Sequence, residues 1–219
     1  MLGALVNNYH VQDLSLIDYA ATYRIQKECV ERVIAGGAQT LLLCEHLPVI
    51  TLGRLAKEAN VLSREAIASK GIRIISVDRG GDVTLHSPGQ LVVYPILRLE
   101  NFKKDLRWYL HQLEQVAIDL LMTFGIVADR IPGKTGVWVD GEKIASIGIG
   151  VKKWVAFHGL AINVCTDLEV FDLIKPCGLD IRMTSMTRLK GEPVDMGGVK
   201  ERLVECFSRG FGLKSEIRV

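Results

Sequence analysis

The chain has 219 residues, of which 48% are apolar and 24% are charged. This composition is ordinary for a globular protein with one sizeable core, so we expect a single domain that spans residues 1–219. The formal net charge is only +2, and Lys and Arg are scattered along the chain, which argues against a protein that binds nucleic acid.

Cysteine usage and the N-terminal residues bear on the compartment. The five cysteines are odd in number and widely spaced, with no CxxC pair and no zinc-finger spacing, so we expect reduced thiols in a cytoplasmic protein. The N-terminus lacks a basic segment followed by a long apolar one, and no apolar run approaches the ~18 residues of a membrane span. We therefore expect no association with a membrane.

Apolar periodicity and glycine or proline residues divide the chain into helices and strands. Apolar side chains at three- and four-residue steps, in segments that stop at glycine, predict amphipathic helices over residues 16–35 and 105–124. Ser63 is suited to cap a short helix that ends near Gly71. The predicted strands are residues 39–45, 72–77, 92–97 and 155–164, and Thr84 is also expected to be in extended conformation. The remaining predicted elements are one or two helical turns over 167–174 and a last helix over 199–209.

The strongest hairpin signal in the chain is Asp140-Gly141, which stands between apolar residues 137–139 and 144–151. This hairpin places Lys143 at the start of its second strand. The order of helix, strands, helix, hairpin, strands and helix predicts an α+β fold, in which helices pack on a mixed and largely antiparallel sheet. No repeat or Ser/Pro-rich linker marks a domain boundary.

One cysteine differs from the other four in its surroundings. Cys177 lies between Pro176, which removes a backbone donor, and Gly178, which permits a positive φ, so this loop is suited to present the sulfur. The others fall in helical or strand patterns, where cysteine is usually a small buried hydrophobe. We therefore expect core packing for Cys29, Cys44, Cys165 and Cys206.

A reactive thiol needs a neighbour that favours the thiolate, because a free thiol with a pKa of ~8.5 is mostly protonated near neutral pH. Lys143, in the segment GEKIASIG, is a candidate for that positive charge. The alternative is an exposed lysine after a hairpin turn, which is the commoner environment of lysine. Sequence separation alone leaves both alternatives open.

The segment RGGDVTLHSPGQL, residues 79–91, is dense in glycine and polar groups between apolar strands. This composition suits a loop whose backbone N–H groups approach a ligand closely, although two turns flanking one edge strand have the same composition. The segment fits neither the phosphate-binding loop GxxxxGK[ST] nor the dinucleotide fingerprint GxGxxG. A nucleotide site of either type is therefore disfavoured.

Two histidines are candidates for hydrogen bonding to an acyl carbonyl or for proton transfer near neutral pH. His86 and His158 both lie in strand patterns close to glycine, and either can equally be a structural histidine. His46 and His10 are weaker candidates. No HxxxH or HExxH spacing is present, so we expect neither a metal nor another cofactor.

Four segments occur in a fixed order within residues 40–180, namely RGGDVTLHSPGQL, GEKIASIG, FHGLAINV and KPCG. In this order and spacing they resemble the octanoyltransferases of lipoate biosynthesis (the LipB family), and four ordered motifs are far more specific than any one. The resemblance implies the fold of the biotin and lipoate protein ligases. It also implies ATP-independent transfer of an octanoyl group from acyl carrier protein to a lysine of lipoyl domains, in 2-oxoacid dehydrogenase E2 subunits or the glycine cleavage H protein.

The same resemblance implies roles for individual residues. Cys177 would carry the octanoyl group as a thioester, and Lys143 would lower the pKa of that thiol and exchange protons. No cofactor is implied, and we expect a monomer. The residues implied to bind the substrate are Arg79, Gly80, Gly81, Asp82, Val83, Thr84, Leu85, His86, Ser146, Ile147, Gly148, His158, Gly159, Leu160 and Ala161.

Leu85 and Ser87 depart from the family's usual YHGPGQ form of the binding loop, which has tyrosine and glycine at these positions. Both departures bear on pocket shape and loop geometry, and hence on the preferred chain length. They do not bear on the reaction type, because the cysteine, the lysine and His86 are retained.

Three other functions compete with this interpretation. An ATP-dependent lipoate or biotin protein ligase shares the implied fold but has a fuller GGG loop, whereas Gly80-Gly81 is followed here by Asp82. A lipoyl amidotransferase of the same superfamily has its cysteine in a different loop. A non-catalytic module that binds acyl carrier protein has no need of Cys177 and Lys143.

Overall fold

The computed structural model describes residues 8–176 and 181–217 of the chain. The α-helices are α1 (Tyr19–Ile34), α2 (Arg64–Ser69), α3 (Leu106–Thr123), α4 (Met186–Lys190) and α5 (Met196–Phe211). The short 3-10 helices are η1 (Glu58–Asn60), η2 (Leu99–Asn101) and η3 (Glu169–Leu173). The strands are β1 (Asn8–Ile17), β2 (Gln39–His46), β3 (Val49–Leu52), β4 (Arg73–Ser76), β5 (Val83–His86), β6 (Gln90–Ile96), β7 (Asp129–Ile131), β8 (Lys134–Val139), β9 (Glu142–Lys152), β10 (Val155–Asn163) and β11 (Lys214–Ile217).

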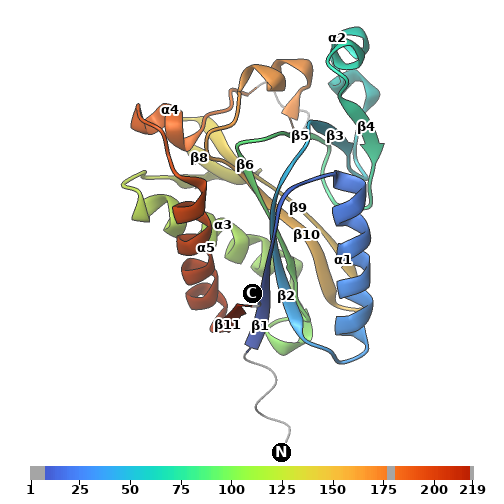
Figure 1. The fold of residues 1–219 in the computed structure, drawn as a ribbon, viewed down its shortest axis with the longest axis vertical. Helices are drawn as coiled ribbons and strands as arrows, with labels where there is room; N and C mark the ends of the chain where they lie inside the picture. Colours follow the sequence, from blue (N-terminus) through green and yellow to red (C-terminus); the bar gives the residue numbers. More distant parts are fainter. Residues whose placement is uncertain (1–7, 177–180, 218–219) are drawn as a thin grey trace, which may run out of the picture.

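The strands form two sheets (Figure 1). The larger sheet has eight strands in the order β11-β1-β2-β6-β10-β9-β8-β7, and the smaller has three in the order β4-β3-β5. In the larger sheet β1 pairs in parallel with β11 and β2, and the other neighbours are antiparallel. The predicted α+β fold with a mixed, largely antiparallel sheet is therefore confirmed.

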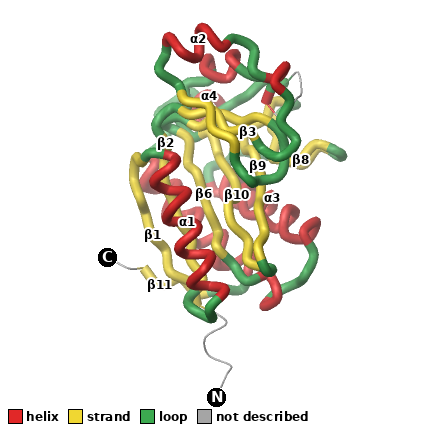
Figure 2. The backbone as a smooth tube through the Cα atoms, turned by 90° about the vertical axis from the view of Figure 1, so that its right-hand side faces the viewer, coloured by secondary structure: helices red, strands yellow, loops and turns green. Residues whose placement is uncertain are grey.

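Helices cover both faces of the large sheet (Figure 2). On one face, Val30 and Val33 of α1 pack in an apolar cluster with residues of β2, β6 and β10. On the other face, α3 and α5 pack together and contribute to the largest apolar cluster. A third cluster lies beneath the small sheet and α2, at one end of the large sheet. The small sheet therefore covers the end of the large sheet at which α1 begins.

The starts of the helices follow from local hydrogen bonding. α1 begins after Asp18, whose carboxylate accepts hydrogen bonds from the backbone N–H groups of Ala20 and Ala21. α3 begins in the same way after Asp105, and Ser63 caps α2 as the sequence predicts. These caps satisfy N–H groups that have no partner within the first turn of a helix.

The predicted hairpin is confirmed as β8 and β9. Asp140 and Gly141 connect the two strands, and their φ angles are both positive, at 49° and 82°. A two-residue hairpin turn of type I′ requires positive φ at both positions. Lys143 is the second residue of β9.

Two sequence predictions are wrong. The first helix does not include residue 16, because Leu16 is paired with Glu45 in the parallel ladder of β1 and β2, and Asp18 starts the helix. Cys165 is exposed rather than packed in the core, because it lies beyond the end of β10, in a turn where its N–H donates to the carbonyl of Gly89. The other three cysteines with this prediction are buried.

The structure also bears on the expected reduced thiols and on the membrane. All four cysteines within the described ranges carry free thiols. In residues 8–176 and 181–217, no helix has the length and apolar character needed to cross a membrane.

Candidate active site

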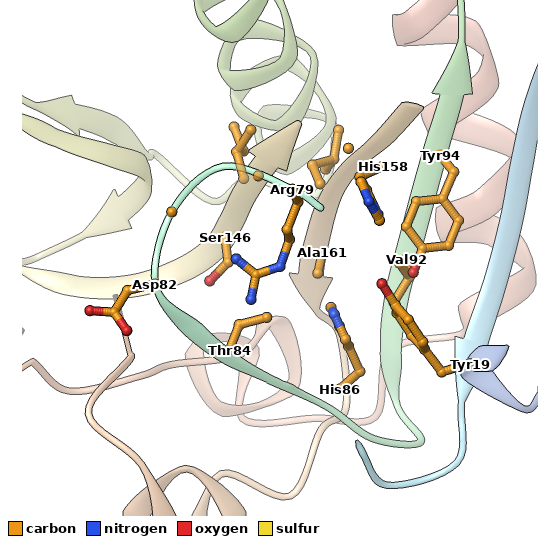
Figure 3. Close-up of a pocket in the computed structure, with 15 residues that line it drawn as sticks. Tyr19, Arg79, Asp82, Thr84, His86, Val92, Tyr94, Ser146, His158 and Ala161 are labelled. Carbon is orange, nitrogen blue, oxygen red and sulfur yellow. The ribbon is translucent and has the colours of Figure 1, made fainter. Parts of the chain in front are cut away.

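A cavity lies where β5 and the glycine-rich loop before it face β6, β9 and β10 of the large sheet (Figure 3). It holds about 460 Å³ of space between its walls, part of which is open to solvent. Arg79, Thr84, His86 and His158 surround a common space, while Asp82 lies on the far side of the loop from the two histidines. The wall consists of Tyr19, Arg79, Gly81, Asp82, Thr84, His86, Val92, Tyr94, Ser146, Ile147, Gly148, His158, Gly159, Leu160 and Ala161.

The alternation of side chains along β5 places only some of the predicted loop residues in this wall. Thr84 and His86 face the cavity, whereas Val83 and Leu85 are fully buried in the cluster beneath the small sheet. Gly80 is also absent from the wall, and its N–H donates to the carbonyl of Ile149 at 2.8 Å. Both alternatives for this segment therefore hold, because β5 is an edge strand and its loop lines a cavity.

Close backbone packing holds the glycine-rich loop in place. The N–H groups of Gly53, Arg54 and Leu55 donate to carbonyls of the loop at 3.0–3.1 Å. A Cβ atom on Gly53 would come within 2.4 Å of the carbonyl oxygen of Gly81, so no larger residue fits there. Main-chain contacts with the segment after β3 therefore fix the conformation of the loop.

Arg79 places a guanidinium group at the cavity although its side chain is largely buried. Its Nη2 donates to the carbonyl and the hydroxyl of Thr51, at 2.8 and 2.9 Å, and its Nη1 donates to the carbonyl of Gly80. A Cβ atom on Gly148 would come within 3.0 Å of the Cδ atom of Arg79. The glycine in β9 therefore leaves room for the arginine side chain.

His158 forms a hydrogen bond with the carboxylate of Asp78 at the edge of the cavity. Its Nε2 lies 2.8 Å from Oδ1 of Asp78, and that carboxylate also accepts from the Tyr23 hydroxyl and the Lys27 ammonium. Burial raises the pKa of Asp78, but these donors outweigh burial and hold the pKa well below its usual range. Because the carboxylate is ionised, His158 is the donor in this pair.

His86 is almost completely buried, and its ring packs against two other rings. The Tyr19 ring stacks on it at a centroid distance of 6.0 Å, and the His46 ring meets it edge-on at 5.6 Å. Burial, followed by the charge of His46 when that ring is protonated, lowers the pKa of His86 to about 3. His86 is therefore neutral over the working range of most enzymes.

Three wall residues were not predicted from the sequence, namely Tyr19, Val92 and Tyr94. Val92 and Tyr94 are two residues apart on β6, so a strand with one face on the cavity presents both. Behind them, His46 accepts from the Tyr94 hydroxyl at 2.8 Å through Nε2, since its Nδ1 donates to the carbonyl of Ile17 at 3.0 Å. The alternation along β6 could have placed Val92 and Tyr94 on one face of the strand. The position of Tyr19 at the start of α1 gives no sign in the sequence that this residue lines the cavity.

Lys143 is fully buried, so the alternative of an exposed lysine after a turn is wrong. Its Nζ lies 5.3 Å from the centroid of the Trp138 ring, whose face attracts a cation. Gly136, with a φ of 123°, makes this packing possible, because a Cβ atom there would lie 2.5 Å from Cε of Lys143. Gly136 is fixed in turn by the carboxylate of Glu114, which accepts its N–H at 3.0 Å.

Cys177 lies outside the described residues, but the chain on both sides of its segment is described. Before it, the N–H of Lys175 donates to the carbonyl of Asn60 at 2.8 Å. The side chain of Asn60 donates in turn to Asp82 of the cavity wall at 2.6 Å. After it, the N–H of Lys143 donates to the carbonyl of Arg182 at 2.9 Å. The flanks of the segment are thus tied to the cavity wall and to Lys143.

Within the described parts of the chain, no group of three or more His, Cys, Asp or Glu side chains is arranged to hold a metal ion. What the site offers is a guanidinium group, neutral imidazoles and hydroxyls around the apolar side chains of Val92 and Ala161.

Residues 18–208 match the family model of the lipoyl protein ligase A/B catalytic domain. Curated relatives named octanoyltransferase include one from Syntrophotalea carbinolica, which is 46% identical over 90% of this chain and 92% of its own length. Another, from Thermosynechococcus vestitus, is 43% identical over 92% of this chain and 89% of its own length.

Solved structures show the same fold at low sequence identity. A putative lipoate protein ligase from T. acidophilum with bound lipoic acid superposes with a TM-score of 0.80 at 16% identity, and the match covers 96% of this chain and 89% of the other. A biotin protein ligase from Aquifex aeolicus in complex with biotin and ATP gives a TM-score of 0.55 at 16% identity, over 94% and 70%. The lipoate and biotin protein ligase fold implied by the sequence is confirmed, and the chain belongs to the lipoyl protein ligase A/B catalytic domain family as an acyltransferase.

Proposed function

We propose that this acyltransferase moves an octanoyl group from octanoyl-acyl carrier protein to a lysine of a lipoyl domain, as the first step of protein lipoylation. Cys177 is the nucleophile, and the acyl group passes through a thioester on its sulfur. The acceptors are lipoyl domains of 2-oxoacid dehydrogenase E2 subunits and the glycine cleavage H protein. The enzyme acts as a monomeric single domain in the cytoplasm and needs no cofactor.

The anchoring of the chain around Cys177 carries this proposal. Lys175, two residues before the cysteine, is linked through Asn60 to Asp82 in the cavity wall. Arg182, five residues after it, is bonded to the backbone of Lys143. Chain connectivity therefore supports a thiol within reach of both the cavity and the buried amine, which is the arrangement that an activated thiol needs.

The chemistry proceeds in two balanced steps. The Cys177 thiolate attacks the carbonyl carbon of the donor thioester, the bond from carbon to the donor sulfur breaks, and the donor leaves as a thiol that takes one proton. The acceptor amine then attacks the new thioester, the amide bond forms, and Cys177 leaves as the thiolate while the amine loses a proton. Lys143 is the residue we assign to proton exchange at the sulfur.

The lining of the cavity supports the proposal that it holds an acyl chain. Its wall presents the apolar side chains of Val92 and Ala161 and the rings of Tyr19 and Tyr94. Burial of one methylene contributes ~0.8 kcal/mol, so the seven carbons beyond the carbonyl of an octanoyl group contribute about 6 kcal/mol when fully buried. A chain of this length can thus be held by burial alone, without a charged partner at its end.

Intact-protein mass spectrometry after mixing with octanoyl-acyl carrier protein, in the absence of ATP, tests this function. We expect the mass of one octanoyl group on the wild type and none on Cys177→Ser, with discharge of the adduct when a lipoyl domain is added. Transfer that requires free octanoate and ATP would instead assign the chain to the ligases. Transfer by Cys177→Ser at the wild-type rate would disprove the covalent mechanism.

A further inference from the structure

A series of hydrogen bonds leads from His86 in the cavity wall to the backbone of Lys143. His86 Nδ1 lies 2.7 Å from Oε1 of Gln90, and Nε2 of Gln90 lies 2.9 Å from Oδ1 of Asn163. Nδ2 of Asn163 donates to the carbonyl of Thr184 at 3.0 Å. The N–H of the same Thr184 donates to the carbonyl of Lys143 at 2.9 Å. The series thus joins the histidine to the strand that carries the lysine.

Sheet register explains why Gln90 and Asn163 meet. Gln90 is the first residue of β6 and Asn163 is the last residue of β10, and the antiparallel ladder pairs them directly. Directly paired residues have side chains on the same face of a sheet, close enough to interact. Both side chains are nearly completely buried. A buried amide with all its polar atoms bonded is costly to disrupt and holds its orientation.

The donor and acceptor of every hydrogen bond in this series follow from the bond between Asn163 and the carbonyl of Thr184. A main-chain carbonyl can only accept, so Asn163 must present its amide nitrogen to Thr184 and its oxygen to Gln90. Gln90 must then present its nitrogen to Asn163 and its oxygen to His86. An amide oxygen can only accept, so the proton of the neutral His86 ring is on Nδ1. Nε2 is therefore the unprotonated nitrogen.

Nε2 of His86 is consequently a hydrogen-bond acceptor in the cavity wall. No residue within 8–176 or 181–217 forms a hydrogen bond with it, and the His86 ring points into the cavity (Figure 3). The titratable groups around this ring are Tyr19 of α1, His46 of β2, Arg79 of the loop and His158 of β10. Burial, and then the charges of His46, Arg79 and His158, lower the pKa of His86 to about 3, so the acceptor stays unprotonated at neutral pH.

We propose that Gln90 and Asn163 are positioning residues, which hold His86 with its proton on Nδ1 so that Nε2 accepts an N–H hydrogen bond from the acceptor lysine's amine. This inference rests on the proposed function. The hydrogen bond orients the lone pair of the neutral amine toward the thioester. His86 does not store the proton, because its environment disfavours the imidazolium, and the proton leaves toward the departing sulfur.

The chemistry of the two substrates selects the amine as the donor of this bond. An acyl chain and a thioester carbonyl have no hydrogen to donate, so they do not match an acceptor. The interpretation of His86 as a donor to the acyl carbonyl is disfavoured as well, because Nε2 carries no proton to donate. N–H groups come from two sources, the attacking amine and the amides of the carrier's prosthetic arm, and the two half-reactions separate them.

Nitrogen NMR of histidine-labelled protein tests the tautomer without any substrate. Long-range correlations distinguish protonated from unprotonated ring nitrogens, and His86→Gln assigns the signals. We expect His86 to be protonated on Nδ1 in the wild type. In Gln90→Met, which has the same shape but no acceptor, we expect the proton to move to Nε2. A wild-type ring protonated on Nε2 would overturn the proposal.

Rapid mixing measures the two half-reactions separately. We expect Gln90→Met and Asn163→Leu to slow discharge of the octanoyl-enzyme by a lipoyl domain roughly tenfold, the effect of one lost hydrogen bond, and to slow its formation less. A larger effect on formation would assign the hydrogen bond to the donor's arm and contradict our assignment. If the wild type forms no adduct, the proposed function fails, while the NMR result stands or falls by itself.

Gln90→Glu is the matched variant, because its carboxylate still accepts the proton of Nδ1 but raises the pKa of His86. Its discharge rate relative to the wild type should rise with pH, as the His86 imidazolium loses its Nε2 proton. A purely structural role for Gln90 would give a ratio that does not change with pH. Gln90→Met should also give a constant low ratio, and a ratio that rises as in Gln90→Glu would contradict the proposal.

Discussion

The cavity wall and the surroundings of Lys143 stabilise buried polar groups in different ways. In the wall and directly behind it, two imidazoles are neutral, since burial lowers the pKa of His86 in the wall to about 3 and that of His46 behind it to about 4. In each ring, Nδ1 carries the proton and donates it to an oxygen, the Ile17 carbonyl for His46 and the Gln90 side chain for His86. Lys143, in contrast, is an amine packed between an aromatic face and a glycine backbone. The fold thus separates neutral, hydrogen-bonded imidazoles from the buried amine of Lys143.

The largest expected effect comes from removing that amine. Lys143→Met keeps the length of the side chain and removes the charge, and we expect octanoyl transfer to fall by at least ~100-fold, in the range for loss of a general acid or base. Alkylation of Cys177 by iodoacetamide near neutral pH should slow as well, because the thiolate loses its positive neighbour. Peptide-resolved mass spectrometry measures that rate.

Lys134→Met is the control for this variant. The Nζ of Lys134 also lies near the Trp138 ring, 5.6 Å from its centroid, but the side chain is exposed. We expect no change in Cys177 alkylation. Equal rates in the Lys143 variant and the wild type would mean that Lys143 does not tune the thiol.

Gly136→Ala should disturb the amine without altering its chemistry. The new Cβ atom would lie 2.5 Å from both Cε of Lys143 and the carbonyl oxygen of Ala145, at a φ that alanine rarely adopts. We expect transfer to fall at least ~10-fold and stability to fall by about 1–3 kcal/mol in urea unfolding. Gly133→Ala has a positive φ but no atom within 4 Å of its Cβ, so it should cost stability without the loss of transfer.

A change at Asp78 should alter stability more than it alters the reaction. The folded-state pKa of Asp78 lies below its unfolded value, so its contribution to stability is present above the unfolded pKa and is lost as pH falls through the folded pKa. We expect Asp78→Asn to cost about 1–2 kcal/mol at pH 7, a value reduced for its partial exposure. The difference from the wild type should shrink below about pH 4. A difference that is constant with pH would contradict this account.

The smallest effect is expected at Leu85, where the sequence departs from its family. Because Leu85 faces the core of the small sheet and not the cavity, Leu85→Val should cost about 1 kcal/mol of stability and leave the preference among six-, eight- and ten-carbon donors unchanged. Ala161→Val, in the cavity wall, should shift that preference toward shorter chains. Competition between donors of different length, followed by mass spectrometry, distinguishes the two variants.

Much of the fold could be predicted from the sequence, because long amphipathic segments and turn residues give strong local signals. The helices α1 and α3 and the hairpin at Asp140-Gly141 are of this kind. The strand β1 was missed because its alternation is short: residues 8–11 alternate in burial, but all five positions from residue 12 to 16 are half-buried or exposed. β11 has only four residues and depends on its parallel partner. Such pairings are set by tertiary contacts, which sequence periodicity does not report.

The candidate site was predictable where it lies on ordered motifs and not where it depends on contacts. The resemblance named most wall residues, yet Val83 and Leu85 point into another core because they alternate with Thr84 and His86. The bond between Gln90 and Asn163 joins positions 73 residues apart, so only the sheet register reveals it. The burial of Lys143 likewise depends on Gly136 in the neighbouring strand.

Mapping of the acyl group to one residue tests the central claim most directly. After reaction with octanoyl-acyl carrier protein, the enzyme is digested and the modified peptide is fragmented. Trypsin does not cut between Lys175 and Pro176, so fragmentation must separate Cys165 from Cys177 in the same peptide. We predict an octanoyl thioester on Cys177 that a lipoyl domain removes. A stable adduct on the exposed Cys165, or none on Cys177 while transfer proceeds, would contradict the account.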